Sequence, residues 1–261
     1  MEPKPILNFD SVTYVKNKST ILDNLSFSLN EKDSLVILGR NGAGKTTLIN
    51  LLFGYLWPTS GSISVFGETY GETPMVPIQN QIGIVQSNHQ ETLLQRLTTI
   101  EMVVTGLIGT LGLYKEISKI QMEEANSLLS QIGMESKKDQ PFQTLSSGEK
   151  MKILLLRAMG KGKRLLILDE PAAALDLTAR VDFFLSCESM KLKNPNLTRI
   201  LITHRLEEIP ESFQKLLLLK EGKILAFGDK KKVLTAENLS NLYDLPLVLN
   251  EQNGQYSVSV S

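Results

Sequence analysis

The sequence predicts an α/β fold built on a largely parallel sheet. Three short apolar runs are typical of strands buried on both faces. They lie at residues 34–38, 164–168 and 199–202. Helical patterns separate these runs, and strands that alternate with helices favour a parallel sheet with helices on both faces. A glycine-rich turn follows the first run directly, which marks the carboxyl edge of that strand as a place to look for a ligand site.

The other elements expected before residue 90 are short. Alternation of apolar and polar residues predicts strands from Leu7 to Tyr14 and from Leu25 to Leu29. Residues Lys45–Phe53 have helical character, and a turn at 58–61 leads into a strand over Ser62–Phe66.

The second half of the chain begins with longer helices. A helical insertion is expected over about residues 87–145, and a further helix over Ser147–Met159. Two apolar runs on either side of Glu221-Gly222 predict a hairpin. We expect one domain over residues 1–230 and a short C-terminal extension over 231–261, with Lys230–Lys232 as a solvated surface feature.

Composition excludes several classes of protein. The 261 residues include 28 basic and 28 acidic side chains, and this balance lowers the expectation of nucleic-acid binding. With 42% hydrophobic and 21% charged residues, bulk disorder is excluded. A single cysteine, Cys187, and two histidines disfavour a disulfide or a zinc site. The least polar long stretch, 102–114, contains polar residues and glycines and is too short to span a membrane.

A phosphate-binding motif occupies residues 39–46, between an apolar strand and a helix. The motif GRNGAGKT fits G-x-x-x-x-G-K-[ST], in which backbone N–H groups converge on phosphate oxygens and the following helix adds its positive dipole end. Lys45 is expected to reach the β- and γ-phosphates, and the Thr46 hydroxyl to bind Mg²⁺. The residues expected to bind the nucleotide here are Gly39, Arg40, Asn41, Gly42, Ala43, Gly44, Lys45, Thr46 and Thr47.

Two carboxylates follow a second apolar strand. Asp169 ends that strand, where a parallel sheet presents its ligand-facing edge, and can hold Mg²⁺. Glu170 is placed to polarise an attacking water. The simpler alternative is a charged pair at a strand end, but the phosphate motif upstream favours the functional interpretation.

With these motifs, the chain resembles the nucleotide-binding subunits of ABC (ATP-binding cassette) transporters over roughly residues 7–228. Leu145-Ser146-Ser147-Gly148-Glu149 resembles the family's LSGGQ signature and opens a helix. The other matching positions, in chain order, are Tyr14 (adenine stacking), Gln86 (Q-loop), Asp176 (D-loop) and His204 (switch histidine). The resemblance implies a P-loop NTPase core with a mostly parallel sheet, an N-terminal antiparallel β subdomain and an inserted α-helical subdomain.

The resemblance also implies roles. Glu170, His204, Gln86 and Lys45 are expected to be catalytic, and Thr46, Gln86 and Asp169 to hold Mg²⁺. Tyr14, Ser146, Ser147, Gly148 and Asp176 are expected to contact ATP. Each assignment has an alternative: an ordinary strand aromatic for Tyr14, a strand cap for Gln86, a structural histidine for His204 and a simple helix cap for Ser146-Ser147.

The signature departs from the family pattern at two positions. Ser147 replaces the first of two glycines and Glu149 replaces the usual glutamine, whereas Gly148 is retained. These replacements bear on the rate of turnover and not on nucleotide binding. Smaller departures stand before the phosphate strand, at Asp33-Ser34, and before the D-loop, at Ala172-Ala173.

The resemblance implies an ATPase subunit that forms a head-to-tail dimer around two MgATP, with a second copy or a homologous cassette. It is expected on the cytoplasmic face of a membrane, docked on a separate permease, with no nucleic-acid partner. Residues 98–107 and 203–210 are similar to importers of metal chelates and of oxyanions such as molybdate. Two alternatives remain. One is a stand-alone soluble ATPase that acts as a nucleotide switch; the other, less supported, is a P-loop kinase.

Overall fold

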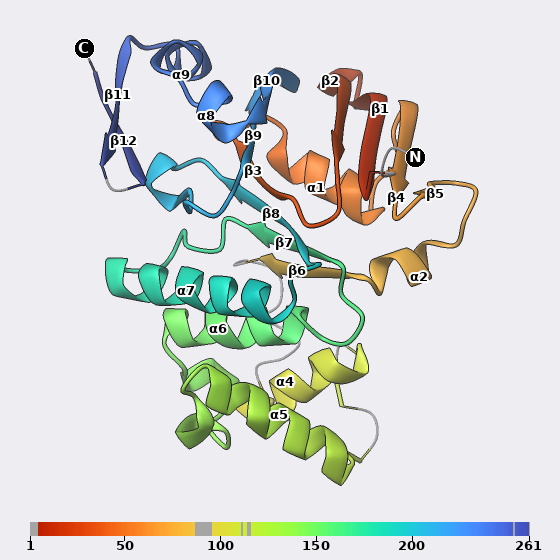
Figure 1. Cartoon of the computed structure of the whole chain (residues 1–261). Helices are drawn as coiled ribbons and strands as arrows, with labels where there is room; N and C mark the ends of the chain where they lie inside the picture. The colour runs from red at the N-terminus through yellow and green to blue at the C-terminus, as the bar shows by residue number, and fades with distance from the viewer. Residues whose placement is uncertain (1–4, 87–95, 111, 114–115, 253, 261) are drawn as a thin grey trace. The chain divides into compact units, whose positions relative to one another are not determined.

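The computed structural model describes residues 5–86, 96–110, 112–113, 116–252 and 254–260 (Figure 1). The chain divides into two compact units. The first unit takes its described residues from 1–79 and 196–261, and the second from 80–195. The start of the predicted helical insertion, residues 87–95, lies outside the described residues. The predicted domain boundary near residue 230 stays a prediction.

An antiparallel sheet opens the first unit, as expected. Its order is β2-β1-β4-β5, with bounds Ser19–Leu29 for β2, Leu7–Lys16 for β1, Ser60–Val65 for β4 and Glu68–Thr69 for β5. The first two strands are longer than predicted because Asn17 and Lys18, both at positive φ (51° and 65°), close a tight hairpin between them. Two consecutive positive φ angles match the twist of the strands that such a turn joins.

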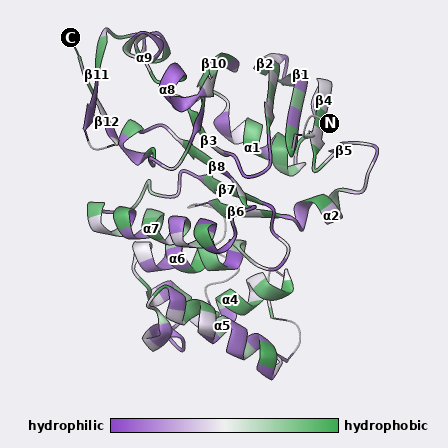
Figure 2. Ribbon diagram, in the orientation of Figure 1, coloured by the Kyte–Doolittle hydropathy of each residue, from purple (hydrophilic) through white to green (hydrophobic). Residues whose placement is uncertain are grey.

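The predicted parallel strands are confirmed in the same unit. β3 (Ser34–Leu38) pairs in parallel with both β8 (Thr198–Thr203) and β9 (Lys215–Lys220). Every residue of β3 and β8 is buried; β3 is largely apolar, and β8 has an apolar centre at residues 200–202 (Figure 2). β10 (Lys223–Asp229) returns antiparallel to β9, which confirms the predicted hairpin at Glu221-Gly222.

Helices and a terminal hairpin complete the first unit. α1 (Lys45–Phe53) has the predicted bounds. No helix or strand was predicted in the C-terminal extension, yet it contains a helix and a two-stranded hairpin. The remaining elements are α2 (Met75–Gln79), η3 (Leu206–Glu208), α8 (Lys230–Val233), α9 (Ala236–Tyr243), β11 (Leu247–Gln252) and β12 (Gln255–Val260).

The second unit is mostly helical and contains one parallel strand pair. β6 (Ile82–Gln86) and β7 (Leu165–Asp169) pair in parallel. Three of its helices begin with a capping box, in which a Ser or Thr and the residue three positions later satisfy each other's backbone N–H. The helical elements are α4 (Thr99–Ile108), α5 (Lys119–Gln131), η1 (Glu135–Lys137), η2 (Phe142–Thr144), α6 (Ser147–Ala158) and α7 (Leu177–Lys193).

Lys230 is buried, contrary to the prediction for residues 230–232. The sequence suggested that Lys230–Lys232 is a solvated surface run, but Lys230 is only 4% exposed. Its Nζ donates to the backbone oxygens of Pro210 and Glu211, both at 3.0 Å. The prediction was wrong for this residue because two backbone carbonyls distant in sequence replace its water, whereas Lys231 and Lys232 are exposed. Within the part of the chain that the structure describes, no helix is both long and apolar enough to cross a membrane.

Gly106 allows α4 and α6 to approach closely in the second unit. A Cβ at Gly106 would lie 2.4 Å from the backbone oxygen of Arg157. On the other side of the same contact, a Cβ at Gly160 would lie 2.1 Å from the backbone oxygen of Gly106. Backbone atoms cannot rotate away as a side chain can, so a methyl group at either site requires the helices to separate.

Gly106→Ala should therefore lower the free energy of unfolding by about 1–3 kcal/mol, the usual cost of overpacking. Helix propensity alone predicts the opposite sign, a gain of about 1 kcal/mol for alanine over glycine. Urea unfolding of the nucleotide-free protein measures the difference. Ser127→Ala on the exposed face of α5 is the matched control, and a stabilised Gly106→Ala protein contradicts the close-approach argument.

Candidate nucleotide-binding site

The phosphate loop connects β3 to α1 and depends on two glycines. Gly42 and Gly44 have φ angles of 83° and 102°, values that residues with a Cβ rarely adopt. Gly44 is also the N-cap residue of α1. Because glycine has no side chain, no side-chain oxygen accepts a hydrogen bond from the first N–H groups of the helix. The first turn of α1 therefore presents backbone N–H groups and the positive end of the helix dipole, which is the chemistry of an anion site.

Lys45 is buried under this loop. It is 7% exposed, and its Nζ donates to the backbone oxygens of Gly39 at 2.9 Å and Arg40 at 3.1 Å. These carbonyls hold the ammonium group against the backbone of the loop that the sequence motif assigned to phosphate. A buried ammonium group held by neutral carbonyls is well placed to attract an anion, because the carbonyls satisfy its hydrogen bonds without cancelling its charge.

Tyr14 and His204 belong to the same unit as the phosphate loop. Tyr14 on β1 is half-buried and pairs with Leu22 of β2, and a Cβ at Gly44 would meet the Leu22 side chain at 2.6 Å. At the other end of the loop, the Gly39 N–H donates to the backbone oxygen of Thr203 at 3.4 Å, one residue before His204. The strands therefore bring the adenine candidate and the switch candidate to the two sides of the phosphate loop.

The segment that carries His204 is anchored by a buried carboxylate. The Thr203 hydroxyl donates to Glu208 Oε2 at 2.5 Å and accepts from the Arg205 N–H at 3.0 Å. Glu208 is 3% exposed, so this bond is shielded from water. The two bonds fix the turn that follows β8, and with it the backbone of His204.

In the second unit, Gln86 and Asp169 end adjacent parallel strands. They are register partners in the pairing of β6 with β7, and Gln86 Nε2 donates to Asp169 Oδ2 at 3.0 Å. This bond orients the amide group of Gln86. Hydroxyl, amide and carboxylate oxygens are ligands that Mg²⁺ accepts, so Thr46, Gln86 and Asp169 fit the ion in donor chemistry. Glu170 follows directly and has a φ of 45°, a strained value for a residue with a side chain.

The signature segment forms the N-terminus of α6. Ser146 is the N-cap: its Oγ accepts from the Glu149 N–H at 3.3 Å, and Glu149 Oε2 accepts from the Ser146 N–H at 3.0 Å. Lys137 donates to the other oxygen of Glu149, and this contact lowers the pKa of that carboxyl. Glutamine at this position could complete the same capping box, as Gln121 does at the start of α5, so the departure changes the charge and not the cap. Lys137 compensates the added charge.

Gly148 and Asp176 have structural partners in the second unit. A Cβ at Gly148 would lie 2.7 Å from Ala179 Cβ, so glycine permits the close packing of α6 on α7. Asp176 is the N-cap of α7 and accepts from the Ala179 N–H at 2.8 Å. Ser147 is exposed in the first turn of α6. These contacts account for the local structure and leave their predicted contacts with ATP as predictions.

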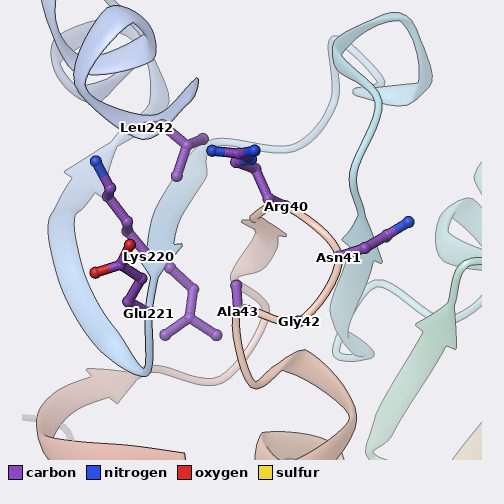
Figure 3. Close-up of a pocket in the computed structure, with 8 residues that line it drawn as sticks. Arg40, Asn41, Gly42, Ala43, Lys220, Glu221 and Leu242 are labelled. Carbon is purple, nitrogen blue, oxygen red and sulfur yellow. The ribbon is translucent and has the colours of Figure 1, made fainter. Parts of the chain in front are cut away.

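Residues at the end of α9 were missed by the sequence analysis. A cavity of about 260 Å³ lies beside the phosphate loop, lined by residues 40–43, 219–221 and Leu242. Figure 3 shows Arg40 directed toward Leu242 and Asn41 directed to the opposite side. Asp244 forms an ion pair with Arg40 at 3.1 Å. No local pattern in the sequence could have shown this contact, because the two residues are 204 positions apart.

The sheet, the loop and Lys45 together define a P-loop nucleotide-binding protein. A sequence profile described as ABC transporter matches residues 22–173, and the chain belongs to this family as an ATP-binding protein. It is 36% identical to the uncharacterized ABC transporter ATP-binding protein YlmA of Bacillus subtilis, over 93% of this chain and 92% of the relative. The family identified from the motifs is thereby confirmed.

Two further comparisons concern metal-transport proteins. The chain is 31% identical to the manganese transport system ATP-binding protein MntB of Bacillus subtilis, over 91% of this chain and 92% of the relative. Among solved structures, it is similar to one described as an inward-facing conformation of a metal-chelate type ABC transporter. That likeness has a TM-score of 0.78 and 26% identity, and covers 99% of this chain and 97% of the other.

Proposed function

We propose that this chain is the ATP-hydrolysing subunit of an ABC importer, and that two copies enclose two MgATP to drive a separate membrane permease. The observation that carries the proposal is the phosphate loop with the buried Lys45 ammonium group hydrogen-bonded to its backbone. Loop N–H groups and Lys45 bind the phosphates, and Tyr14 stacks on the adenine ring. Bound Mg²⁺ supplies positive charge that offsets the charge developing on the transferred phosphoryl group.

Hydrolysis needs a base and a group that contacts the γ-phosphate. The Glu170 carboxylate accepts the proton of the attacking water as the new bond to phosphorus forms and ADP leaves. His204 contacts the γ-phosphate from the end of β8. Gln86 orients the attacking water and, through its hydrogen bond, the carboxylate of Asp169. These residues come from both units, and their joint action on one nucleotide is part of the proposal.

A second copy completes each site. The N-terminus of α6, with the Ser146 hydroxyl and the Gly148 N–H, is an anion-binding end that we assign to the γ-phosphate held by the partner copy. Such an arrangement is a two-fold head-to-tail dimer in which neither copy has a whole site alone. Loss of the γ-phosphate removes the contact across the interface, so hydrolysis is coupled to opening of the dimer.

The cargo class follows from the relatives. MntB is named for manganese transport, and a further relative, the molybdate import protein MolC of Haemophilus influenzae, is 30% identical over 94% of this chain and 90% of its own length. We assign this chain to an importer of a metal ion, a metal chelate or an oxyanion. It then works as a peripheral protein on the cytoplasmic face of the membrane.

The test is affinity purification of tagged Glu170→Gln protein from native cells in mild detergent, followed by mass spectrometry. The substitution is chosen because ATP should stay bound, which preserves the assembled state. A stoichiometric protein with several membrane spans supports the permease partnership, and untagged cells control for non-specific membrane proteins. A clean homodimer, or soluble partners alone, contradicts the proposal and indicates a stand-alone nucleotide switch.

A further inference from the structure

The last residue of α9, Tyr243, contacts the segment that carries His204. Its hydroxyl donates to the backbone oxygen of His204 at 3.2 Å. Burial raises the pKa of Tyr243, so the hydroxyl keeps its proton and remains a donor at neutral pH. Because the acceptor is a backbone atom, the bond fixes the path of the chain at His204 and does not involve the imidazole.

Asp244, the next residue, contacts the phosphate loop. It ends α9 in the left-handed region (φ 57°, ψ 37°), and its Oδ2 accepts from Arg40 Nη1 at 3.1 Å. Lys220 donates to the other carboxylate oxygen, which lowers the pKa of Asp244 and keeps it charged. Lys220 also donates to the backbone oxygen of Asn241 at 2.6 Å, so β9 holds the same turn.

A cavity borders the Tyr243 bond. A cavity of about 450 Å³ is lined by residues 204–207 on one side and by Tyr243, Leu245, Leu247, Ser257 and Val258 on the other. Leu206 and Glu208 are buried and pack the inner side of the turn, whereas His204 and Arg205 are only half-buried on the side of the cavity. On that side, single polar contacts add to what packing supplies. The turn at 203–208 therefore has an internal anchor at Glu208 and an external one at Tyr243.

We propose that the C-terminal turn of α9, residues 241–244, is a brace that positions two loops of the nucleotide site. Tyr243 holds the switch segment through His204, and Asp244 holds the phosphate loop through Arg40. Both act as positioning residues, since each reaches the nucleotide only through another residue. The inference rests on the proposed ATPase function, and it gives the C-terminal extension a role in that reaction.

Tyr243→Phe removes the hydroxyl alone and is the main test. Hydrogen–deuterium exchange should become several-fold faster at residues 203–208. The kcat for ATP hydrolysis should fall about five-fold, the equivalent of one ordinary hydrogen bond. The Kd for a non-hydrolysable ATP analogue should not change, because Lys45 and the loop glycines are untouched. Purely structural damage would instead lower Tm and weaken ATP binding as well.

Tyr256→Phe is the matched control. Tyr256 lies on β12, is 7% exposed and has its ring 5.4 Å from Lys230 Nζ, so it tests loss of a hydroxyl in the same extension. Asp244→Asn is the second variant, because asparagine also tolerates the left-handed conformation. It should speed exchange at residues 39–43 and leave 203–208 less affected than Tyr243→Phe does.

Equal exchange at 203–208 in the wild type and Tyr243→Phe overturns the brace, as does faster exchange spread evenly over the chain. A wild type that binds ATP and never hydrolyses it refutes the proposed function instead. In that case the exchange difference between Tyr243→Phe and Tyr256→Phe still decides whether the brace exists, so the two failures are distinguishable.

Discussion

Glu170→Gln should lower kcat for ATP hydrolysis by about 10²–10⁴-fold, the usual contribution of a general base, while ATP binding persists. A carboxylate accepts a proton from water, and an amide of the same shape does not. The phosphate contacts that we propose come from Lys45 and the loop glycines, none of which this substitution changes. The expected result is therefore a protein that loads ATP and retains it.

The backbone at Glu170 makes glutamine the right replacement. Its φ of 45° is strained for glutamate and for glutamine alike, because both have the same unbranched Cβ. Asp169 and Gln86 keep their bond, so the pair that we propose as Mg²⁺ ligands is not disturbed. A glycine at this position would relieve the strain and remove the base together, and the two effects could not be separated.

Phosphate release at saturating MgATP measures the loss, and light scattering after gel filtration measures assembly. With ATP retained, Glu170→Gln should accumulate as an ATP-dependent dimer, whereas the wild type cycles back to monomer. Glu72→Gln, at an exposed turn of the first unit, controls for the loss of a carboxylate. Turnover within a factor of about three of wild type, far less than a general base contributes, would show that another group takes the proton.

The sequence predicted best those features that depend on local pattern. The run 34–38 is a buried strand and Lys45–Phe53 is a helix because apolar spacing and the glycine turn determine each within a few residues. The ends of two strands at Gln86 and Asp169 are local features as well, whereas the pairing of those strands, 83 positions apart, comes from the structure. What those residues do to ATP remains a prediction from the family resemblance.

Tertiary contacts explain what the sequence could not show. Residues 247–252 and 255–260 form a hairpin that alternates weakly and is mostly exposed, so it lacks the apolar signal of a strand. The sequence around Lys230 is typical of a surface lysine, but in the structure its Nζ donates to the backbone oxygens of Pro210 and Glu211. Tyr243 meets His204 across 39 positions of the chain. Each feature depends on a partner far away in sequence, and no spacing rule covers such partners.

Lys45→Ala should weaken ATP binding by about 100-fold or more. A hydrogen bond to a charged group contributes about 1.5–3 kcal/mol, and each 1.4 kcal/mol is a factor of ten in affinity. The lysine is proposed to reach both the β- and the γ-phosphate, so alanine removes two such contacts along with the charge. ADP, which has no γ-phosphate, should lose less affinity than ATP does.

The thermal shift on adding MgATP measures this loss, because a ligand that binds the folded state raises Tm by mass action. Alanine also leaves the carbonyls of Gly39 and Arg40 without their donor, so Tm of the nucleotide-free variant should fall by itself. The diagnostic quantity is thus the ATP-induced shift relative to each variant's own baseline. Lys231→Ala, at an exposed site on α8, should keep the full shift. An unchanged shift in Lys45→Ala would mean that the loop N–H groups bind phosphate without the lysine, and would remove it from the site.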